Sequence, residues 1–160
     1  EMTFLLEDKK RLGYVSKMIK DISKTGNTLV LTNRIKNGEA LQDLIPESEF
    51  VQGSMAVSDR KDAYNDINEG TNTITIATYG VAAVGINIPR IFNLVLLEPG
   101  KSFVRVIQSI GRGVRMAEDK DFVQIWDVTS RCKFSKRHLT ERKKYYKDAS
   151  YPFTIDKITY

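Results

Sequence analysis

Short apolar runs of the kind found in buried strands alternate with longer stretches of helical periodicity along this chain. The runs are rich in leucine and β-branched residues, which is typical of strands that are buried on both faces of a sheet. Between them, apolar residues recur three and four positions apart, as on one face of a helix. Repeated strand–helix alternation predicts a parallel sheet with right-handed crossovers. We therefore expect one α/β domain with a helical arm at each end.

The same patterns predict where each element begins and ends. Helices are expected over Asp8–Thr25, Arg34–Leu44, Ser58–Glu69, Ser102–Ile110 and Phe134–Lys147. Strands are expected over Thr28–Thr32, Phe50–Gln52, Thr73–Ala77, Leu94–Leu97 and Phe122–Val128. Ligands of open parallel sheets bind beyond the carboxyl ends of the strands, so functional residues are expected in the segments that follow these strands.

Composition excludes several classes of protein. The 160 residues can bury one hydrophobic core, and no apolar run approaches the ~20 residues of a membrane span. The start at Glu1 shows no signal-peptide pattern and no Met, so we expect a piece of a longer chain. The single cysteine, Cys132, cannot form an internal disulfide, and no Cys/His cluster has metal-ligand spacing. We expect a reducing, cytoplasmic setting (the host cytoplasm for a viral protein) and no metal site.

Positive charge is concentrated in a basic segment, residues 131–147. Its eight Lys or Arg and one acid, Glu141, give it +7; subtracting this from the net charge of +5 leaves −2 for the other residues. Such asymmetry indicates a polyanionic partner, and the alternative is a solvated helical face. The candidates for phosphate contacts here are Lys136, Arg137, Lys143, Lys144 and Lys147.

The most informative motif is Gln-Ser-Ile-Gly-Arg-Gly-Val-Arg at residues 108–115. On a helix, the spacing of Gln108, Arg112 and Arg115 places them on one face. Two adjacent guanidiniums repel each other unless an anion lies between them, and paired arginines on a triphosphate stabilise the charge that develops in phosphoryl transfer. Gly111 weakens a helix by up to ~1 kcal/mol, which indicates close approach of a ligand or another domain. The alternative is a surface helix end whose arginines pair with the acids at 118 and 119.

A second motif, Ala-Thr-Tyr-Gly-Val-Ala-Ala-Val-Gly-Ile-Asn-Ile-Pro, spans residues 77–89 and follows directly from an expected strand. Its residues are mostly small, so backbone amides and the Thr78 hydroxyl can approach a phosphate closely. The alternative is a close-packed strand-to-helix turn that needs small residues for steric reasons only.

Together the motifs resemble the C-terminal motor domain of superfamily 2 helicases of the DExH/DEAD-box type. The family pattern Gln-x-x-Gly-Arg-x-x-Arg is matched by Gln108, Gly111, Arg112 and Arg115. The preceding family motif is matched by Ala77, Thr78, Gly85, Asn87 and Pro89. Two shorter motifs, at residues 29–34 and 52–54, precede these in the family's order. The resemblance implies a RecA-like three-layer α/β domain, with a mostly parallel sheet and helices on both faces.

The resemblance also implies a role for each matched residue. Arg112, Arg115 and Gln108 are expected to be catalytic, with Arg115 as the finger that touches the γ-phosphate. Gly85, Asn87 and Gly111 are expected near the nucleotide, although many members have Asp where this chain has Asn87. The residues expected to face the nucleic acid are Thr32, Asn33, Arg34, Gly53, Ser54 and Thr78.

From Val95 onward, including Gln-Ile-Trp-Asp at 124–127, the chain more narrowly resembles recombination helicases of T4-type bacteriophages, which remodel branched DNA. The expected partners are branched or single-stranded DNA or an RNA–DNA hybrid, and an N-terminal motor domain of the same chain. ATP with Mg²⁺ is expected to be bound mainly by that other domain, because the phosphate-binding loop and the acidic Mg²⁺ motif are absent here. The Gly-Lys-Ser at 100–102 lacks the required earlier glycine, since Val95 stands there.

These patterns divide the chain into an arm or linker at 1–26, a RecA-like domain at 27–130 and a basic helix and tail at 131–160. We expect a helicase and ATP hydrolase in the full-length protein and no activity from this chain alone. The competing hypothesis is a non-catalytic nucleic-acid-binding or annealing module with a degenerate motor fold. A small-molecule α/β enzyme is disfavoured, because the single histidine, His138, lies in the basic helix and away from the strand ends.

Overall fold

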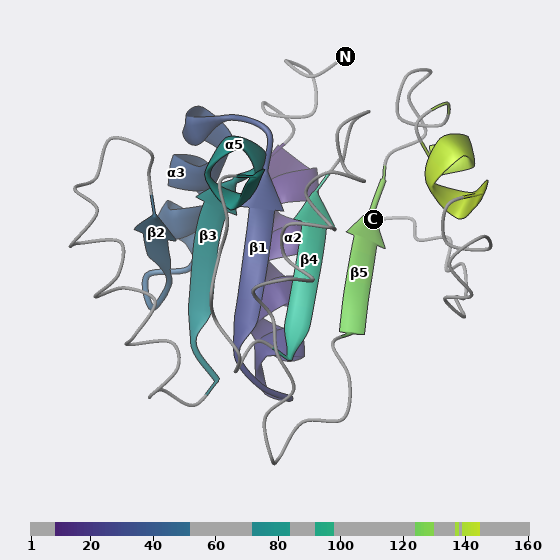
Figure 1. Ribbon diagram of the computed structural model, residues 1–160. Helices are drawn as coiled ribbons and strands as arrows, with labels where there is room; N and C mark the ends of the chain where they lie inside the picture. The colour runs from purple at the N-terminus through teal and green to yellow at the C-terminus, as the bar shows by residue number, and fades with distance from the viewer. Residues whose placement is uncertain are drawn as a thin grey trace.

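The computed structural model describes residues 9–51, 72–83, 92–97, 124–129, 137 and 139–144. Within these ranges the chain forms a five-stranded sheet and helices that pack against it (Figure 1). The strands are β1 (Thr28–Thr32), β2 (Glu49–Val51), β3 (Ile74–Thr78), β4 (Asn93–Leu97) and β5 (Gln124–Val128). The helices labelled in Figure 1 are α2 (Lys9–Ser23), α3 (Ile35–Leu44) and α5 (Tyr79–Ala83). Residues 137 and 139–144 are also helical.

The sheet has the order β2-β3-β1-β4-β5, and every neighbouring pair of strands is parallel. Two of its inner strands, β1 and β4, are buried at every residue. Continuous apolar runs such as Leu29–Leu31 suit this position because both faces of the strand exclude water. The expected parallel α/β sheet is therefore confirmed.

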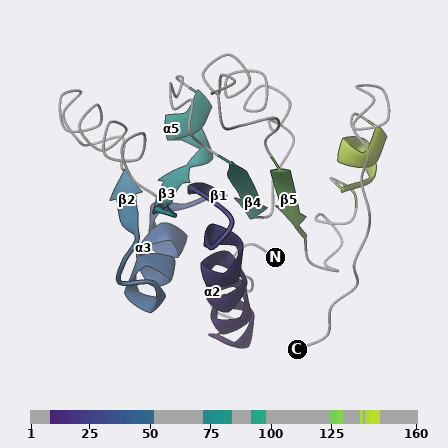
Figure 2. The same cartoon turned by 90° about the horizontal axis from the view of Figure 1, so that it is seen from below.

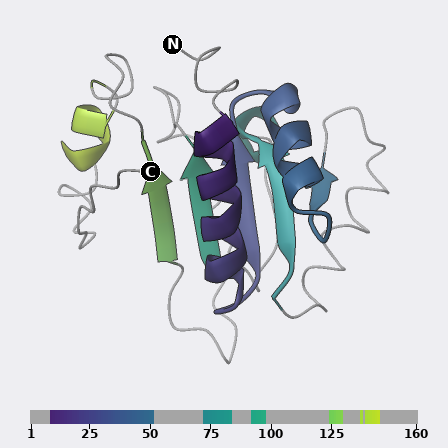
Figure 3. The ribbon, with the colours of Figure 1, turned by 180° about the vertical axis from the view of Figure 1, so that it is seen from behind.

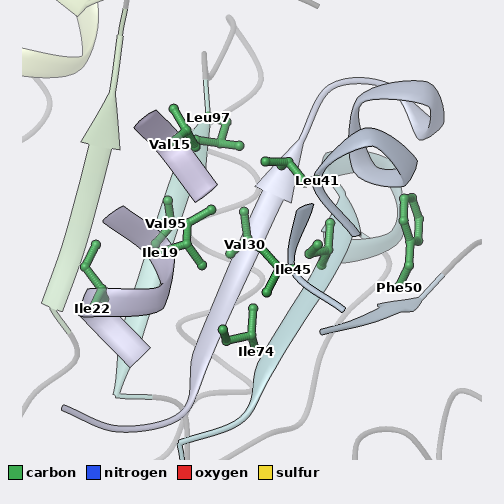
Figure 4. Packing of buried hydrophobic residues seen from close by; sticks show 11 residues of the cluster. Val15, Ile19, Ile22, Val30, Leu41, Ile45, Phe50, Ile74, Val95 and Leu97 are labelled. Atoms are coloured by element: carbon green, nitrogen blue, oxygen red, sulfur yellow. The ribbon is translucent and has the colours of Figure 1, made fainter. Parts of the chain in front are cut away.

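Both longer helices, α2 and α3, lie on one face of the sheet, and the short α5 lies on the other side (Figures 2 and 3). The core under α2 and α3 joins apolar side chains of these helices to side chains of the strands (Figure 4). From α2 it takes Val15, Ile19 and Ile22, each at most 6% exposed. The helix expected to form most of an N-terminal arm thus packs on the sheet, while the domain boundaries at 26/27 and 130/131 stay predictions.

Two buried asparagines close the amino edge of the sheet. The Asn27 carboxamide oxygen accepts hydrogen bonds from the backbone N–H and the hydroxyl of Thr73, at 2.9 and 3.0 Å. The Asn93 amide donates to the Thr25 hydroxyl at 2.9 Å, and its oxygen accepts from the Trp126 indole N–H at 3.3 Å. Buried amides require such partners, and these bonds connect the end of α2 with the starts of three strands.

Gly26, between α2 and β1, has φ of +150°, a conformation that side chains disfavour. A Cβ atom there would also lie 2.8 Å from Phe92. Glycine is therefore required for this tight entry into the first strand.

The expected boundaries agree with the described elements to within about two residues. The expected helix Asp8–Thr25 is Lys9–Ser23, and the expected strand Thr73–Ala77 is Ile74–Thr78. No helix or strand was assigned from the sequence to Tyr79–Ala83, which the structure shows to be the short helix α5. The helices expected over 58–69 and 102–110 lie outside the described residues. Among the residues that are described, no helix has the length and apolarity to cross a membrane.

Candidate functional site

The carboxyl edge of the sheet brings together two of the segments that the sequence analysis selected. Because β1 and β3 are parallel neighbours with Thr32 paired to Thr78, both strands end side by side. Asn33 and Arg34 follow the first strand, and Tyr79 follows the second. The predicted nucleic-acid residues of these two turns are therefore adjacent, although their contact with nucleic acid stays a prediction.

The turn after β1 is held by its own side chains. Thr32 is fully buried, and its hydroxyl donates to the backbone oxygen of Arg34 at 3.3 Å. The Asn33 amide donates to the backbone oxygen of Leu97 at 3.4 Å. Arg34 is exposed in extended conformation, directly before α3, and no side-chain hydrogen bond caps that helix. Of these three residues, Asn33 and Arg34 are exposed and Thr32 is buried, and their contact with nucleic acid stays a prediction.

Thr78 ends β3 and begins α5. Its half-buried hydroxyl oxygen accepts a hydrogen bond from the backbone N–H of Val81 at 3.4 Å, which fixes the first turn of the short helix. Gly80 is exposed, and a Cβ atom there would meet nothing nearer than the Thr78 hydroxyl at 3.9 Å. The small residues therefore leave the backbone of this turn open to approach, as a phosphate contact requires.

Sequence reasoning missed Tyr79, which is an integral part of this edge. Its hydroxyl donates to the backbone oxygen of Leu97 at 3.1 Å, the same oxygen that Asn33 contacts. A backbone acceptor leaves no trace in the residue pattern, so only the three-dimensional arrangement reveals this interaction.

The helical part of the basic segment lies beside β5 (Figures 1 and 3). Arg137 and Lys144 are exposed there, and Lys143 is half-buried. Arg142, in contrast, is 1% exposed and forms an ion pair with Asp127 of β5, with Nε 2.6 Å from Oδ2. One of the eight cations of the basic segment is thus neutralised inside the protein.

Several predicted site residues fall outside the part of the chain that the structure describes. They are Gly53, Ser54, Gly85, Asn87, Gln108, Gly111, Arg112, Arg115, Lys136 and Lys147. All the residues expected to face the nucleotide are among them, so contacts with ATP stay a prediction. Within the described ranges, no group of three or more His, Cys, Asp or Glu could hold a metal ion.

Comparison with known proteins gives a consistent result. Residues 10–117 match the family described as helicase conserved C-terminal domain. The ATP-dependent DNA helicase uvsW of Enterobacteria phage T4 is 28% identical over 141 residues, which cover 85% of this chain and 28% of that protein. This chain thus spans less than a third of that relative's length.

Solved structures share the fold. The crystal structure of T4 UvsW matches with a TM-score of 0.73 and 22% identity, over 91% of this chain and 34% of that chain. S. cerevisiae Dbp5 bound to RNA and ADP BeF3 matches with a TM-score of 0.66 and 21% identity, over 89% of this chain and 38% of that chain. These likenesses show a fold similar to RecA-like helicase C-terminal domains, as the sequence analysis expected.

Proposed function

The chain belongs to the family of helicase conserved C-terminal domains, and from this premise we propose that it is the second motor domain of an ATP-dependent DNA helicase that remodels branched DNA. The observation that carries the proposal is the pairing of Thr32 with Thr78, which aligns two turns at one sheet edge within the matched region. Such an edge is where open α/β sheets bind their ligands.

In this proposal the chain contributes one wall of the nucleic-acid track. Arg34 and the open turn at Thr78 contact the phosphate backbone, together with Gly53 and Ser54 and the cations of the basic segment. Backbone contacts of this kind position a nucleic acid without reading its sequence, as a motor that moves along many sequences requires. The Dbp5 structure supports a role of this fold in nucleic-acid binding, because that protein was solved with RNA bound.

The chain also contributes part of the ATPase site. Arg112, Arg115 and Gln108 meet the triphosphate, and Gly85, Asn87 and Gly111 lie near the nucleotide. An N-terminal motor domain of the same chain holds ATP with Mg²⁺ through its phosphate-binding loop, which this sequence lacks. The division of the chain at 1–26, 27–130 and 131–160 is part of this proposal.

Branched DNA is proposed as the substrate in recombination, repair or replication. The support is the similarity to uvsW of phage T4, a protein named as an ATP-dependent DNA helicase, together with the resemblance of the segment after Val95 to recombination helicases.

A protein that carries both motor domains tests the proposal. We expect DNA to stimulate its ATP hydrolysis, and a forked duplex to be unwound faster than a blunt duplex of the same sequence. DNA binding and strand annealing without ATP hydrolysis would favour the non-catalytic module. Equal unwinding of both duplexes would support the helicase activity and contradict the proposed preference for branched DNA.

A further inference from the structure

The buried guanidinium of Arg142 is held in a closed polar cluster. Besides the ion pair through Nε, its Nη2 donates to Asp127 Oδ1 at 2.9 Å and to the hydroxyl of Thr129. The Thr129 hydroxyl donates in turn to Asp127 Oδ1 at 2.7 Å. A buried charge is tolerated only with such paired, hydrogen-bonded partners, so this arginine serves the fold and does not face a ligand.

This cluster fixes the rotation of the helical part of the basic segment. Arg142 and the half-buried Leu139 are three positions apart and share the face that turns toward the domain. Arg137 and Lys144, seven positions apart, share an exposed face. With Arg142 held against β5, the described cations Arg137, Lys143 and Lys144 are kept in a defined direction.

The cluster also decides which edge of the sheet carries this helix. Asp127 and Thr129 lie at the carboxyl end of β5, and β5 is parallel to β4, which is parallel to β1. The carboxyl end of β5 therefore lies at the same edge as the turns that follow Thr32 and Thr78. Figure 1 shows this helix beside the upper, carboxyl end of β5.

We propose that Arg142 is a positioning residue for nucleic-acid binding. It contacts no nucleic acid itself. Its pair with Asp127 holds the helical residues 137 and 139–144 at the carboxyl edge, where Arg137, Lys143 and Lys144 extend the phosphate-binding surface of the two turns. This rests on the proposed function, and it adds that the basic segment binds as a docked helix and not as a loose cationic tail.

A docked helix and a loose basic tail predict opposite effects of Asp127→Asn on DNA affinity. Asp127→Asn removes a negative charge, so a loose basic tail should bind DNA as well as before or more tightly. If the pair positions the helix, the same change undocks it and affinity falls. Glu141→Gln is the matched control, because it removes one carboxylate from an exposed position of the same helix.

The experiment measures binding of the 160-residue chain to a fluorescent forked DNA over a range of salt concentrations. For Asp127→Asn and Arg142→Gln we expect weaker binding, by about five- to eightfold at 0.1 M salt for each phosphate that is no longer neutralised, and a flatter salt dependence. For Glu141→Gln we expect unchanged or tighter binding. Unchanged or tighter binding by Asp127→Asn would overturn the proposal.

A milder change guards against loss of the fold. Thr129→Val removes only the hydroxyl of the cluster, and thermal unfolding followed by circular dichroism shows whether each variant is folded at the assay temperature. If Asp127→Asn and Arg142→Gln are unfolded there, Thr129→Val decides, with weaker binding expected and unchanged binding overturning the proposal.

Combined variants show whether Arg142 acts on DNA binding by positioning Lys143 and Lys144 or by an unrelated loss of structure. Replacing Lys143 and Lys144 with Ala should weaken binding in the wild-type chain and have little further effect in the Arg142→Gln background, because the lysines are already displaced. Fully additive effects would overturn the proposal. A wild-type chain that does not bind DNA would overturn both this inference and the proposed nucleic-acid role.

Discussion

The hydroxyl of Tyr79 and the backbone oxygen of Leu97, 3.1 Å apart, connect two strands that are not neighbours. Tyr79 follows β3 and Leu97 ends β4, with β1 between them in the sheet. Because β3 and β4 lie two strand spacings apart, about 10 Å, the long Tyr79 side chain has to cross the end of β1 to make this bond. The pairing of β1 with β4 ends at Leu31 and Leu96. The oxygen of Leu97 therefore lies one residue beyond this ladder, where Tyr79 contacts it.

Tyr79→Phe should lower the free energy of unfolding by about 1 kcal/mol, the usual net contribution of one hydrogen bond, because the change removes only the hydroxyl. Asn33→Ala removes the second donor to the same oxygen. Since the two donors share one acceptor, we expect the double variant to deviate from additivity. Urea unfolding of the three variants measures this, and an unchanged midpoint for Tyr79→Phe would show that the bond contributes nothing to stability.

Two helical glycines should respond in opposite ways to alanine. A Cβ atom on Gly38 of α3 would overlap the ring of Phe50, so Gly38→Ala should destabilise the domain by about 1–3 kcal/mol. Gly13 of α2 has nothing within 4 Å of the same position. Gly13→Ala should therefore stabilise the domain by up to ~1 kcal/mol, because alanine is the better helix former. Urea unfolding measures both, and similar effects at the two sites would contradict the close packing of α3 on Phe50.

The sequence predicted those features that local pattern determines. The run Thr-Leu-Val-Leu-Thr gave β1 its correct boundaries because all of it is buried, and buried strands carry an unbroken apolar signal. The helix α5 was not predicted, because its five residues are too few for a helical periodicity to appear. Its side chains, Tyr-Gly-Val-Ala-Ala, fit a turn equally well.

Contacts between distant residues could not be predicted in this way. Composition treats all cations of the basic segment alike, so it could not identify Arg142 as buried. The distinction depends on Asp127, fifteen positions earlier, at the end of a strand. An acid that ends a strand ahead of a basic segment is the signal that could have suggested the pair.

The isolated chain should not hydrolyse ATP, even with DNA present. The phosphate-binding loop and the acidic Mg²⁺ motif are absent from its sequence, and arginines alone cannot hold the nucleotide for in-line attack. Phosphate release with and without forked DNA measures this. DNA-stimulated turnover by the purified chain would contradict the assignment of nucleotide binding to another domain.

Changing Lys143 and Lys144 together to Ala should flatten the salt dependence of DNA binding. Each neutralised phosphate contributes about 0.7–0.9 to the slope of log affinity against log salt. We expect a decrease of about 1.4–1.8 if both lysines make contacts, and of about 0.7–0.9 if only the exposed Lys144 does. Lys17→Ala, an exposed position on α2, serves as the control and should leave the slope unchanged. An unchanged slope for the double variant would show that these lysines form a solvated face.

Arg115 is expected to act in catalysis only in a protein that carries both motor domains. If Arg115 meets the γ-phosphate as proposed, Arg115→Ala should lower turnover by ~10³-fold or more. ATP binding should fall far less, because the interaction acts mainly in the transition state. Arg115→Lys should also fail, since a point charge cannot replace the planar guanidinium that contacts two phosphate oxygens.

The control for this prediction is Arg34→Ala, at the carboxyl end of β1, where contact with the nucleic acid is proposed instead. That change should raise the DNA concentration needed for half-maximal stimulation and leave turnover at saturating DNA nearly intact, because the contact binds DNA before and during hydrolysis alike. Steady-state hydrolysis at varied ATP and DNA separates the two patterns. Near-normal turnover in both Arg115 variants would mean that this arginine pairs with the acids at 118 and 119 on the surface, and the catalytic role would then have to rest on Arg112.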